Sequence, residues 1–234
     1  MALYLLGALE CLKNHNPYIF DKVVFAGASA GALISASIVC GISLDYVKIK
    51  FLNVAAEAQS KTFGPFTPGF DIEKFLLKSM DHLPKDAHER ANGRLHISVT
   101  RASDLTNEII SSWNSRDELI QSLICSCFIP IFSGSKFPSF RDRLYLDGGY
   151  TNKQPVVTKN TLTISPFTGS AHVCPKTNLS NKEIVWGQYR MELSMDNLRR
   201  MYASIMPPKP HQLAHYHKNG SKDMKNFLEK RKIS

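Results

Sequence analysis

This sequence has no evident cysteine pairs and only a modest fraction of charged residues. Its five cysteines, Cys11, Cys40, Cys125, Cys127 and Cys174, form no CxxC pair and have no zinc-type spacing to histidine. A disulfide framework and a structural zinc site are therefore not indicated. We expect a reducing compartment, with thiols that behave as small buried apolar groups. Only 21% of the residues are charged and 43% are hydrophobic, which excludes a chain that is disordered throughout.

A clear membrane-spanning segment is also lacking. The apolar start of the chain has no basic leader and is interrupted by Glu10 and Lys13, which argues against a signal peptide. The uncharged stretch from Val23 to Leu44 is long enough to cross a bilayer. It is rich in Gly and Ser, however, and divides into a β-branched strand and a small-residue helix, so we interpret it as part of a folded core.

Positive charge is the main bias of the composition. The 29 Lys and Arg residues exceed the 20 Asp and Glu residues, giving a net charge of +9, which favours an anionic partner. More than half of this excess lies in the tail from Lys209 to Ser234. No nucleic-acid-binding motif accompanies these charges, so nucleic acid is a poor fit. A solvated helix face and contact with an anionic lipid surface both stay open for this tail.

Segments with helix and strand patterns alternate along most of the chain. The apolar periodicity predicts helices at residues 3–13, 30–40, 44–61, 72–80, 116–127, 191–202 and 221–232. Strands are expected at residues 23–26, 95–100, 108–112, 143–146 and 161–164. Pro- and Gly-rich stretches at 64–69 and 207–210 should interrupt regular structure. The alternation indicates an α/β sandwich with a largely parallel sheet.

The strongest local signal is Gly27-Ala28-Ser29-Ala30-Gly31, which lies between a predicted strand and a predicted helix. A G-x-S-x-G pattern in that context is typical of a nucleophile elbow. The sharp turn crowds the positions two before and two after the serine, so Gly27 and Gly31 are expected for steric reasons. A glycine-rich turn that packs closely, or that binds phosphate, is the alternative interpretation.

A serine hydroxyl needs a base to become a good nucleophile. None of the eight histidines has a recognisable catalytic context, although an order of Ser29, Asp147 and either His172 or His211 stays open as an α/β-hydrolase alternative. Asp147 itself is the better candidate base. It ends a predicted strand and precedes Gly148-Gly149, and partial burial would raise its pKa and its basicity. A simple turn aspartate would show the same local pattern.

Together, the two motifs resemble the patatin-like phospholipase family, whose catalytic unit is a Ser-Asp dyad without histidine. Further stretches are similar to the adiponutrin-type branch of that family. They are Phe25–Gly31, Thr67–Gly69, Cys127–Ile131, Asp147-Gly148-Gly149 with Thr151, Asn152 and Pro155 after it, Ile164–Phe167, and Met206–Pro210. The similarity runs in order along nearly the whole chain.

The resemblance implies a three-layer patatin-like sandwich with a central, mostly parallel sheet and C-terminal helices. Residues 1–168 would form the acyl hydrolase domain and residues 169–234 a helical extension with a basic tail. Ser29 would be the nucleophile and Asp147 the base, with an acyl-enzyme intermediate and no metal or other cofactor. The expected substrates are triacylglycerols, phospholipids or retinyl esters. The expected location is cytoplasmic, at the surface of lipid droplets or membranes.

The family normally opens with a strand and a Gly-rich loop whose backbone N–H groups form the oxyanion hole. The stretch Tyr4–Ala8 is similar to the helix after that loop, so we expect the first strand and most of the loop to be absent from this chain. The N–H of Ala30, directly after Ser29, is expected to be the remaining donor. One donor is worth on the order of 10² to 10³ in rate. We therefore expect low activity, and a non-catalytic protein that binds lipid surfaces or partners is the alternative.

Overall fold

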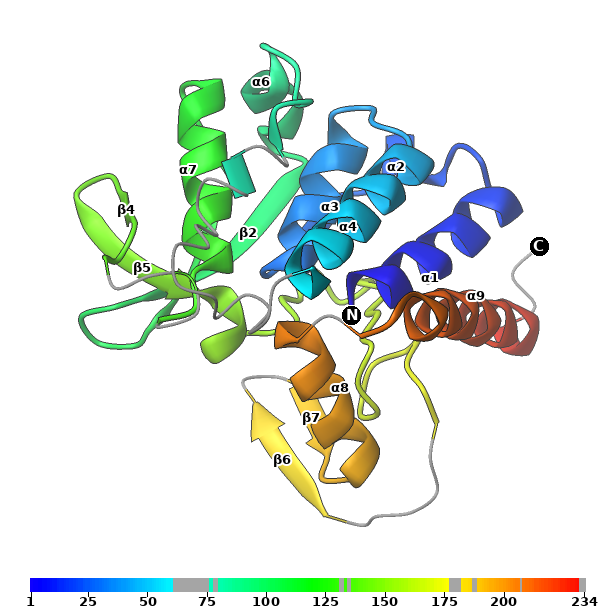
Figure 1. The fold of residues 1–234 in the computed structure, drawn as a ribbon. Helices are drawn as coiled ribbons and strands as arrows, with labels where there is room; N and C mark the ends of the chain where they lie inside the picture. The colour runs from blue at the N-terminus through cyan, green and yellow to red at the C-terminus, as the bar shows by residue number, and fades with distance from the viewer. Residues whose placement is uncertain are drawn as a thin grey trace. The chain divides into compact units, whose positions relative to one another are not determined.

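The computed structural model describes residues 1–60, 76–77, 80–130, 133, 136–176, 182–186, 189–206 and 208–231 (Figure 1). The chain divides into two compact units. The first contains Met1–Lys22, Leu44–Gly64 and Thr158–Ser234, and the second contains Val23–Ser43 and Pro65–Val157. Both of the predicted site motifs lie in the second unit.

The second unit is built around a mixed sheet. Its strands are β1 (Phe25–Gly27), β2 (Leu95–Arg101), β3 (Asn107–Ile110), β4 (Ser139–Phe140) and β5 (Arg143–Asp147). They are arranged in the order β1-β2-β5-β4, with β3 also paired to β2. In the parallel β1–β2 pair Gly27 lies opposite Ile97, and in the antiparallel β2–β5 pair Asp147 lies opposite Val99. The central strand β2 therefore aligns the ends of the two strands that precede the site motifs.

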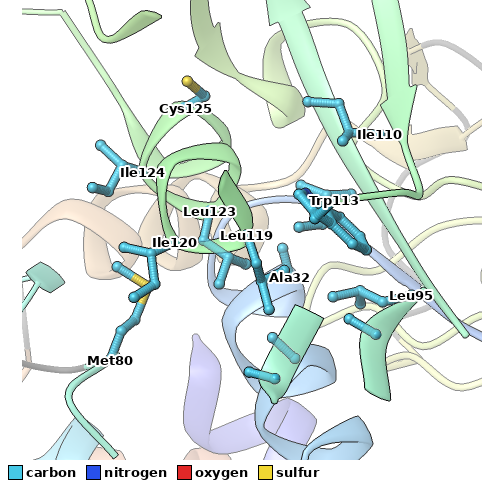
Figure 2. Close-up of a cluster of buried hydrophobic side chains, with 14 of the residues drawn as sticks. Ala32, Met80, Leu95, Ile110, Trp113, Leu119, Ile120, Leu123, Ile124 and Cys125 are labelled. Atoms are coloured by element: carbon cyan, nitrogen blue, oxygen red, sulfur yellow. The ribbon is translucent and has the colours of Figure 1, made fainter. Parts of the chain in front are cut away.

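Helices α3 (Ala30–Val39) and α7 (Arg116–Cys127) pack with this sheet, and α6 (Ala87–Ala91) packs with both of these helices. Helix α7 begins where the sequence favours it, because the Ser115 side chain accepts a hydrogen bond from the Glu118 N–H at 3.1 Å. Figure 2 shows side chains of α7 packed beside Ala32 of α3. Leu119 and Leu123 are fully buried in this core, and burial of a leucine side chain contributes roughly 1.5–3 kcal/mol. The core thereby fixes the elements that carry the site.

The first unit is organised by a close helix pair. Helix α1 (Ala2–His15) packs on α9 (Pro210–Arg231) through two glycines. A Cβ at Gly7 would lie 2.0 Å from the His217 carbonyl oxygen, and a Cβ at Gly220 would lie 1.9 Å from the Tyr4 carbonyl oxygen. The Tyr4 hydroxyl also donates to the Asp223 carboxylate at 2.7 Å. The two backbones approach so closely that neither glycine position has room for a side chain.

The rest of the first unit comprises α2 (Ile19–Lys22), α4 (Leu44–Gln59), the hairpin of β6 (Glu183–Trp186) and β7 (Tyr189–Glu192), and α8 (Met195–Ile205). The buried Asn197 side chain ties α8 to the preceding chain. Its amide nitrogen donates to the carbonyls of Thr168 and Glu192 at 2.9 and 2.7 Å. Among the helices described, none is both long and apolar enough to cross a membrane.

The α/β fold class is confirmed, with a central sheet flanked by helices. Parallel pairing holds for β1 and β2, and the other three pairings that the described strands make in this sheet are antiparallel. Strand direction depends on the connections, and the hairpin-length links to β3 and from β4 to β5 allow only antiparallel pairs. Of the five cysteines, all of which are free, four are buried as expected and Cys11 is partly exposed.

Three expectations for the C-terminal part are wrong. The strand at 161–164 is reduced to one isolated bridge between Ile164 and Val173. The helix expected at 191–202 begins instead at Met195, because residues 189–192 form β7 and Ser194 caps the helix. The tail helix, which was expected to begin at residue 221, begins instead at Pro210, because proline is tolerated in the first turn of a helix. The loop at 64–69 and most of the helix at 72–80 lie outside the described residues.

Candidate active site

Ser29 occupies the turn between β1 and α3. Its backbone has φ 54° and ψ −129°, a conformation that non-glycine residues adopt only under strain. The strand before it ends at Gly27 and the helix after it begins at Ala30. This is the strained strand–turn–helix geometry that the G-x-S-x-G pattern predicts.

The two glycines of the turn are not equivalent. A Cβ at Gly27 would lie 2.5 Å from the Gly31 carbonyl carbon and 2.6 Å from the Ala32 nitrogen, so a side chain is excluded there, as expected. A Cβ at Gly31 would meet no described atom within 4 Å. The expectation that Gly31 is needed for steric reasons is therefore wrong. The crowding is one-sided: Gly27 makes room for the backbone of Gly31, and the reverse is not required.

Asp147 ends β5, and the residue is only 6% exposed. Its carboxylate accepts a hydrogen bond from the Gly149 N–H at 2.6 Å and another from the Ser29 side chain. Burial raises the pKa of Asp147 to about 6, although the Ser29 and Gly149 hydrogen bonds and the charge of Lys153 oppose this shift. The carboxylate is thus ionised at neutral pH and more basic than an exposed aspartate.

The Gly148-Gly149 turn lies directly against β2. A Cβ at Gly148 would lie 2.0 Å from the Ser98 carbonyl oxygen, so only glycine permits this approach. The Thr100 hydroxyl donates to the Asp147 carbonyl at 2.9 Å, and the Ser98 hydroxyl donates to the Asn152 carbonyl at 3.0 Å. These contacts hold the turn, and with it the Asp147 carboxylate, in one position on the sheet.

The C-terminal end of α7 touches both Ser29 and Asp147, which the sequence reasoning missed. The Ser126 hydroxyl accepts from the Ser29 N–H at 2.9 Å, and the Phe128 carbonyl accepts from the Asp147 N–H at 2.8 Å. The Cys127 thiol shares a hydrogen bond with the Ser29 side chain, and burial holds the pKa of this thiol well above its usual value. In the sequence analysis, the stretch from Cys127 to Ile131 contributed to the family resemblance but was assigned no function.

Lys153 is a second residue that the sequence reasoning missed. Burial lowers its pKa to about 8, and the opposing attraction comes from Asp147. A cation near a buried carboxylate favours the ionised form of that carboxylate. The position of Lys153 six residues after Asp147 in a loop gives no periodic signal from which this proximity could be read.

The remaining predicted donor and the histidine alternatives lie as follows. Ala30 is the first residue of α3, so its N–H belongs to the free amides of a helix N-terminus. Its role as an oxyanion donor stays a prediction.

The histidine His172 lies in the first unit, where its Nδ1 atom is 2.7 Å from the Thr163 hydroxyl oxygen and 3.1 Å from the Thr163 nitrogen. His211 lies exposed in the first turn of α9. The Ser29 side chain instead hydrogen-bonds with Asp147 and Cys127.

This arrangement can support acyl transfer. A serine held on a strained turn presents its hydroxyl, and an ionised carboxylate is positioned to accept the hydroxyl proton. The first amide of α3 offers a donor for negative charge that develops beside Ser29. No group of three or more His, Cys, Asp or Glu side chains suited to a metal occurs among the residues described.

Comparison with known proteins gives one consistent result. The family model described as patatin-like phospholipase matches residues 2–158. Over 237 residues the chain is 39% identical to human patatin-like phospholipase domain-containing protein 2, covering 98% of this chain and 46% of that protein. It is 36% identical to human 1-acylglycerol-3-phosphate O-acyltransferase over 239 residues, with 100% and 49% covered. It is 33% identical to mouse omega-hydroxyceramide transacylase over 239 residues, with 98% and 39% covered.

The chain thus spans about half, or less, of the length of these relatives. The family match nevertheless covers most of the chain and includes both site motifs. The chain therefore belongs to the patatin-like phospholipase family.

Proposed function

We propose that the chain is a serine acyl hydrolase or transacylase that acts on lipid esters through Ser29 and Asp147. The observation that carries this proposal is the hydrogen bond between a serine in a strained elbow and a buried carboxylate whose pKa is about 6. A carboxylate with this pKa is a stronger base than an exposed one and is still ionised at neutral pH.

The reaction runs in two halves. Asp147 takes the Ser29 proton while Oγ attacks the ester carbonyl, and the Ala30 N–H donates to the developing oxyanion. The alcohol leaves with the proton held by Asp147, and the acyl group stays on Ser29. Asp147 then removes a proton from water or from another alcohol, which attacks the acyl-enzyme. The bond between the acyl group and Ser29 Oγ breaks, Asp147 returns its proton to Ser29 Oγ, and a fatty acid or a new ester is released. Hydrolysis and transfer therefore differ only in the acceptor.

The names of the relatives support a proposal for the substrate class. Their names describe a phospholipase domain, an acyltransferase for an acylglycerol phosphate and a transacylase for a ceramide. We propose lipid esters as substrates, with triacylglycerols, phospholipids and retinyl esters as the panel to test. The acyl hydrolase domain would span residues 1–168 and the extension residues 169–234, and the family match to residues 2–158 supports the first of these.

Contact with an anionic lipid surface is the second part of the proposal, because lipid esters reside in droplets and membranes. Helix α9 carries a basic stripe, which we define as the exposed side chains His211, His215, Lys218, Lys222 and Lys225. These positions recur every three or four residues and so share one helix face. The opposite face, which includes Met224 and Leu228, is buried. The basic stripe is thus exposed, and Lys225 in it lies 3.9 Å from the Glu229 carboxylate. We propose that the stripe meets phosphate groups, in a cytoplasmic location that five free thiols favour.

Covalent labelling tests the catalytic part. A fluorophosphonate probe should label Ser29, as located by mass spectrometry of the digested protein, and Ser29→Ala should abolish the label. Ser37→Ala is a control, because Ser37 is a buried serine whose hydroxyl is hydrogen-bonded within α3. Labelling that persists in Ser29→Ala would contradict the proposal. If the probe does not label the wild-type protein but the protein still binds vesicles, the result would favour the non-catalytic lipid-binding alternative.

Vesicle sedimentation tests the surface part. Replacing Lys218, Lys222 and Lys225 with Gln should weaken binding to phosphatidylserine-containing vesicles by about 100-fold, since each basic residue near the surface contributes about 1 kcal/mol. A control set of the exposed lysines 22, 85 and 159, replaced in the same way, removes equal charge elsewhere. Equal weakening by both sets would show that net charge alone, rather than the basic stripe, governs binding.

A further inference from the structure

We propose that Ser126, in the last turn of α7, is a positioning residue that holds the Ser29 hydroxyl in line with the Asp147 carboxylate. This inference rests on the proposed Ser-Asp function. It assigns to α7, which carries neither predicted catalytic residue, the task of fixing the distance between the two.

The Ser126 hydroxyl makes two hydrogen bonds to two different elements. It accepts from the Ser29 N–H at 2.9 Å and donates to the Ser98 carbonyl of β2 at 2.8 Å. Ser126 itself is fully buried. The Ser29 N–H lies at the entrance of α3, where helix amides have no partner within the helix. Ser126 supplies that partner and so stabilises the strained backbone of the elbow.

The second bond leads to the turn that carries the base. The Ser98 carbonyl, to which Ser126 donates, is the atom against which Gly148 packs. The Ser98 hydroxyl donates to the Asn152 carbonyl in the loop that follows. Two residues beyond Ser126, the Phe128 carbonyl accepts from the Asp147 N–H. The C-terminal end of α7 therefore contacts the turn that holds Ser29. It also contacts the turn that holds Asp147, both directly through the Phe128 carbonyl and indirectly through Ser98.

A neighbouring serine shows that this geometry is specific. Ser122 lies one turn earlier in α7 and is also fully buried. Its hydroxyl donates to the Leu119 carbonyl within the same helix at 2.7 Å and accepts from the Trp113 ring N–H at 2.9 Å. Ser122 thus has the same burial and the same number of hydrogen bonds as Ser126, but none to the elbow. It is a matched structural control.

Removal of the Ser126 hydroxyl should act on reactivity more than on folding. Ser126→Ala leaves the Ser29 N–H without its acceptor, so the elbow can relax and the Ser29 hydroxyl can move away from Asp147. A misplacement of about 1 Å can cost on the order of 100-fold in rate. We expect the limiting rate of fluorophosphonate labelling at Ser29 to fall by about 10- to 100-fold, with little change in the probe concentration at half-maximal rate. Ser126→Thr, which keeps a hydroxyl, should retain most of the rate.

The experiment compares the limiting labelling rate with the thermal midpoint for wild type, Ser126→Ala, Ser126→Thr and Ser122→Ala. We expect similar losses of thermal stability in the two alanine variants and slow labelling only in Ser126→Ala. A wild-type rate in Ser126→Ala, or an equal slowing in Ser122→Ala, would overturn the inference. If Ser126→Ala does not fold, Ser126→Cys, which keeps the size but accepts a hydrogen bond weakly, replaces it under the same criteria. A wild type without a label at Ser29 would instead refute the Ser-Asp function, and this inference with it.

Discussion

Asp147→Asn should stabilise the protein at neutral and alkaline pH while removing its reactivity. Residue Asp147 is only 6% exposed, and the pKa of its carboxylate is about 6 in the folded chain, against an ordinary value of 3.8. Burial is the main cause of this shift, which means that the ionised carboxylate is less stable in the folded chain than in water. Asparagine has nearly the same shape, can still accept from the Gly149 N–H, and carries no charge.

The magnitude follows from the two pKa values. Between pH 3.8 and about 6 the folded chain binds more protons at Asp147 than the unfolded chain does. The stabilising effect of protonation is therefore fully present below pH 3.8 and is lost as the pH rises through 6. A shift of about two units corresponds to roughly 3 kcal/mol above pH 7, and to about 0.5 kcal/mol near pH 4. At pH 8, Asp147→Asn should raise the thermal midpoint by roughly 6–12 °C.

Thermal unfolding at pH 4, 6 and 8 is the assay. The difference between Asp147→Asn and wild type should grow from pH 4 to pH 6 and level off above pH 7. Asp142→Asn is the control, because Asp142 lies exposed in the turn between β4 and β5 and loses the same charge at a position where asparagine also tolerates a positive φ. A gain that does not depend on pH, or a loss at pH 8, would refute the burial argument.

Three further predictions concern packing and charge. Gly27→Ala should prevent stable folding of the elbow, whereas Gly31→Ala should leave the thermal midpoint unchanged or slightly higher, because only the first position is crowded and alanine is the better helix former; equal damage at both would contradict the one-sided contact. Gly220→Val should destabilise the α1–α9 pair by several kcal/mol in chemical denaturation, since a Cβ there would lie 1.9 Å from a backbone oxygen of α1; wild-type stability would refute that packing. Lys153→Met should move the pH midpoint of Ser29 labelling upward, because it removes a cation that lowers the pKa of Asp147; an unchanged midpoint would show that the two charges do not interact.

Elements with complete local signals could be predicted from the sequence. Helix α7 has the expected bounds, 116 to 127, because Ser115 caps it, acidic residues fill its first turn and Pro130 follows it. The β6–β7 hairpin was missed because Met191 and Glu192 are good helix formers and lie next to a true helix, so local propensity favoured the wrong element. Strand direction was also beyond local patterns, because it depends on which strands the connections bring together.

The candidate site divides in the same way. Ser29 and Asp147 could be found because each lies in a short motif that contains a sterically required glycine, Gly27 in one and Gly148 in the other. Ser126 could not, because its contact with Ser29 joins residues 97 positions apart and a buried serine in a helix has many possible partners. Gly31 shows a different limit of prediction, because the motif suggests a steric need for glycine at a position where the structure has room for a Cβ. The motif identifies the turn, but only the backbone geometry shows which of its glycines the turn requires.

The central claim is that Asp147 activates Ser29, and the pH dependence of fluorophosphonate labelling tests it most directly. The rate of labelling at Ser29, measured by mass spectrometry of the digested protein from pH 4.5 to 8.5, should rise with pH to a plateau. Its midpoint should lie near 6, the pKa of Asp147, and Asp147→Asn should remove the rise together with most of the rate. Labelling of Ser29 that keeps its rate and pH profile in Asp147→Asn would contradict the account.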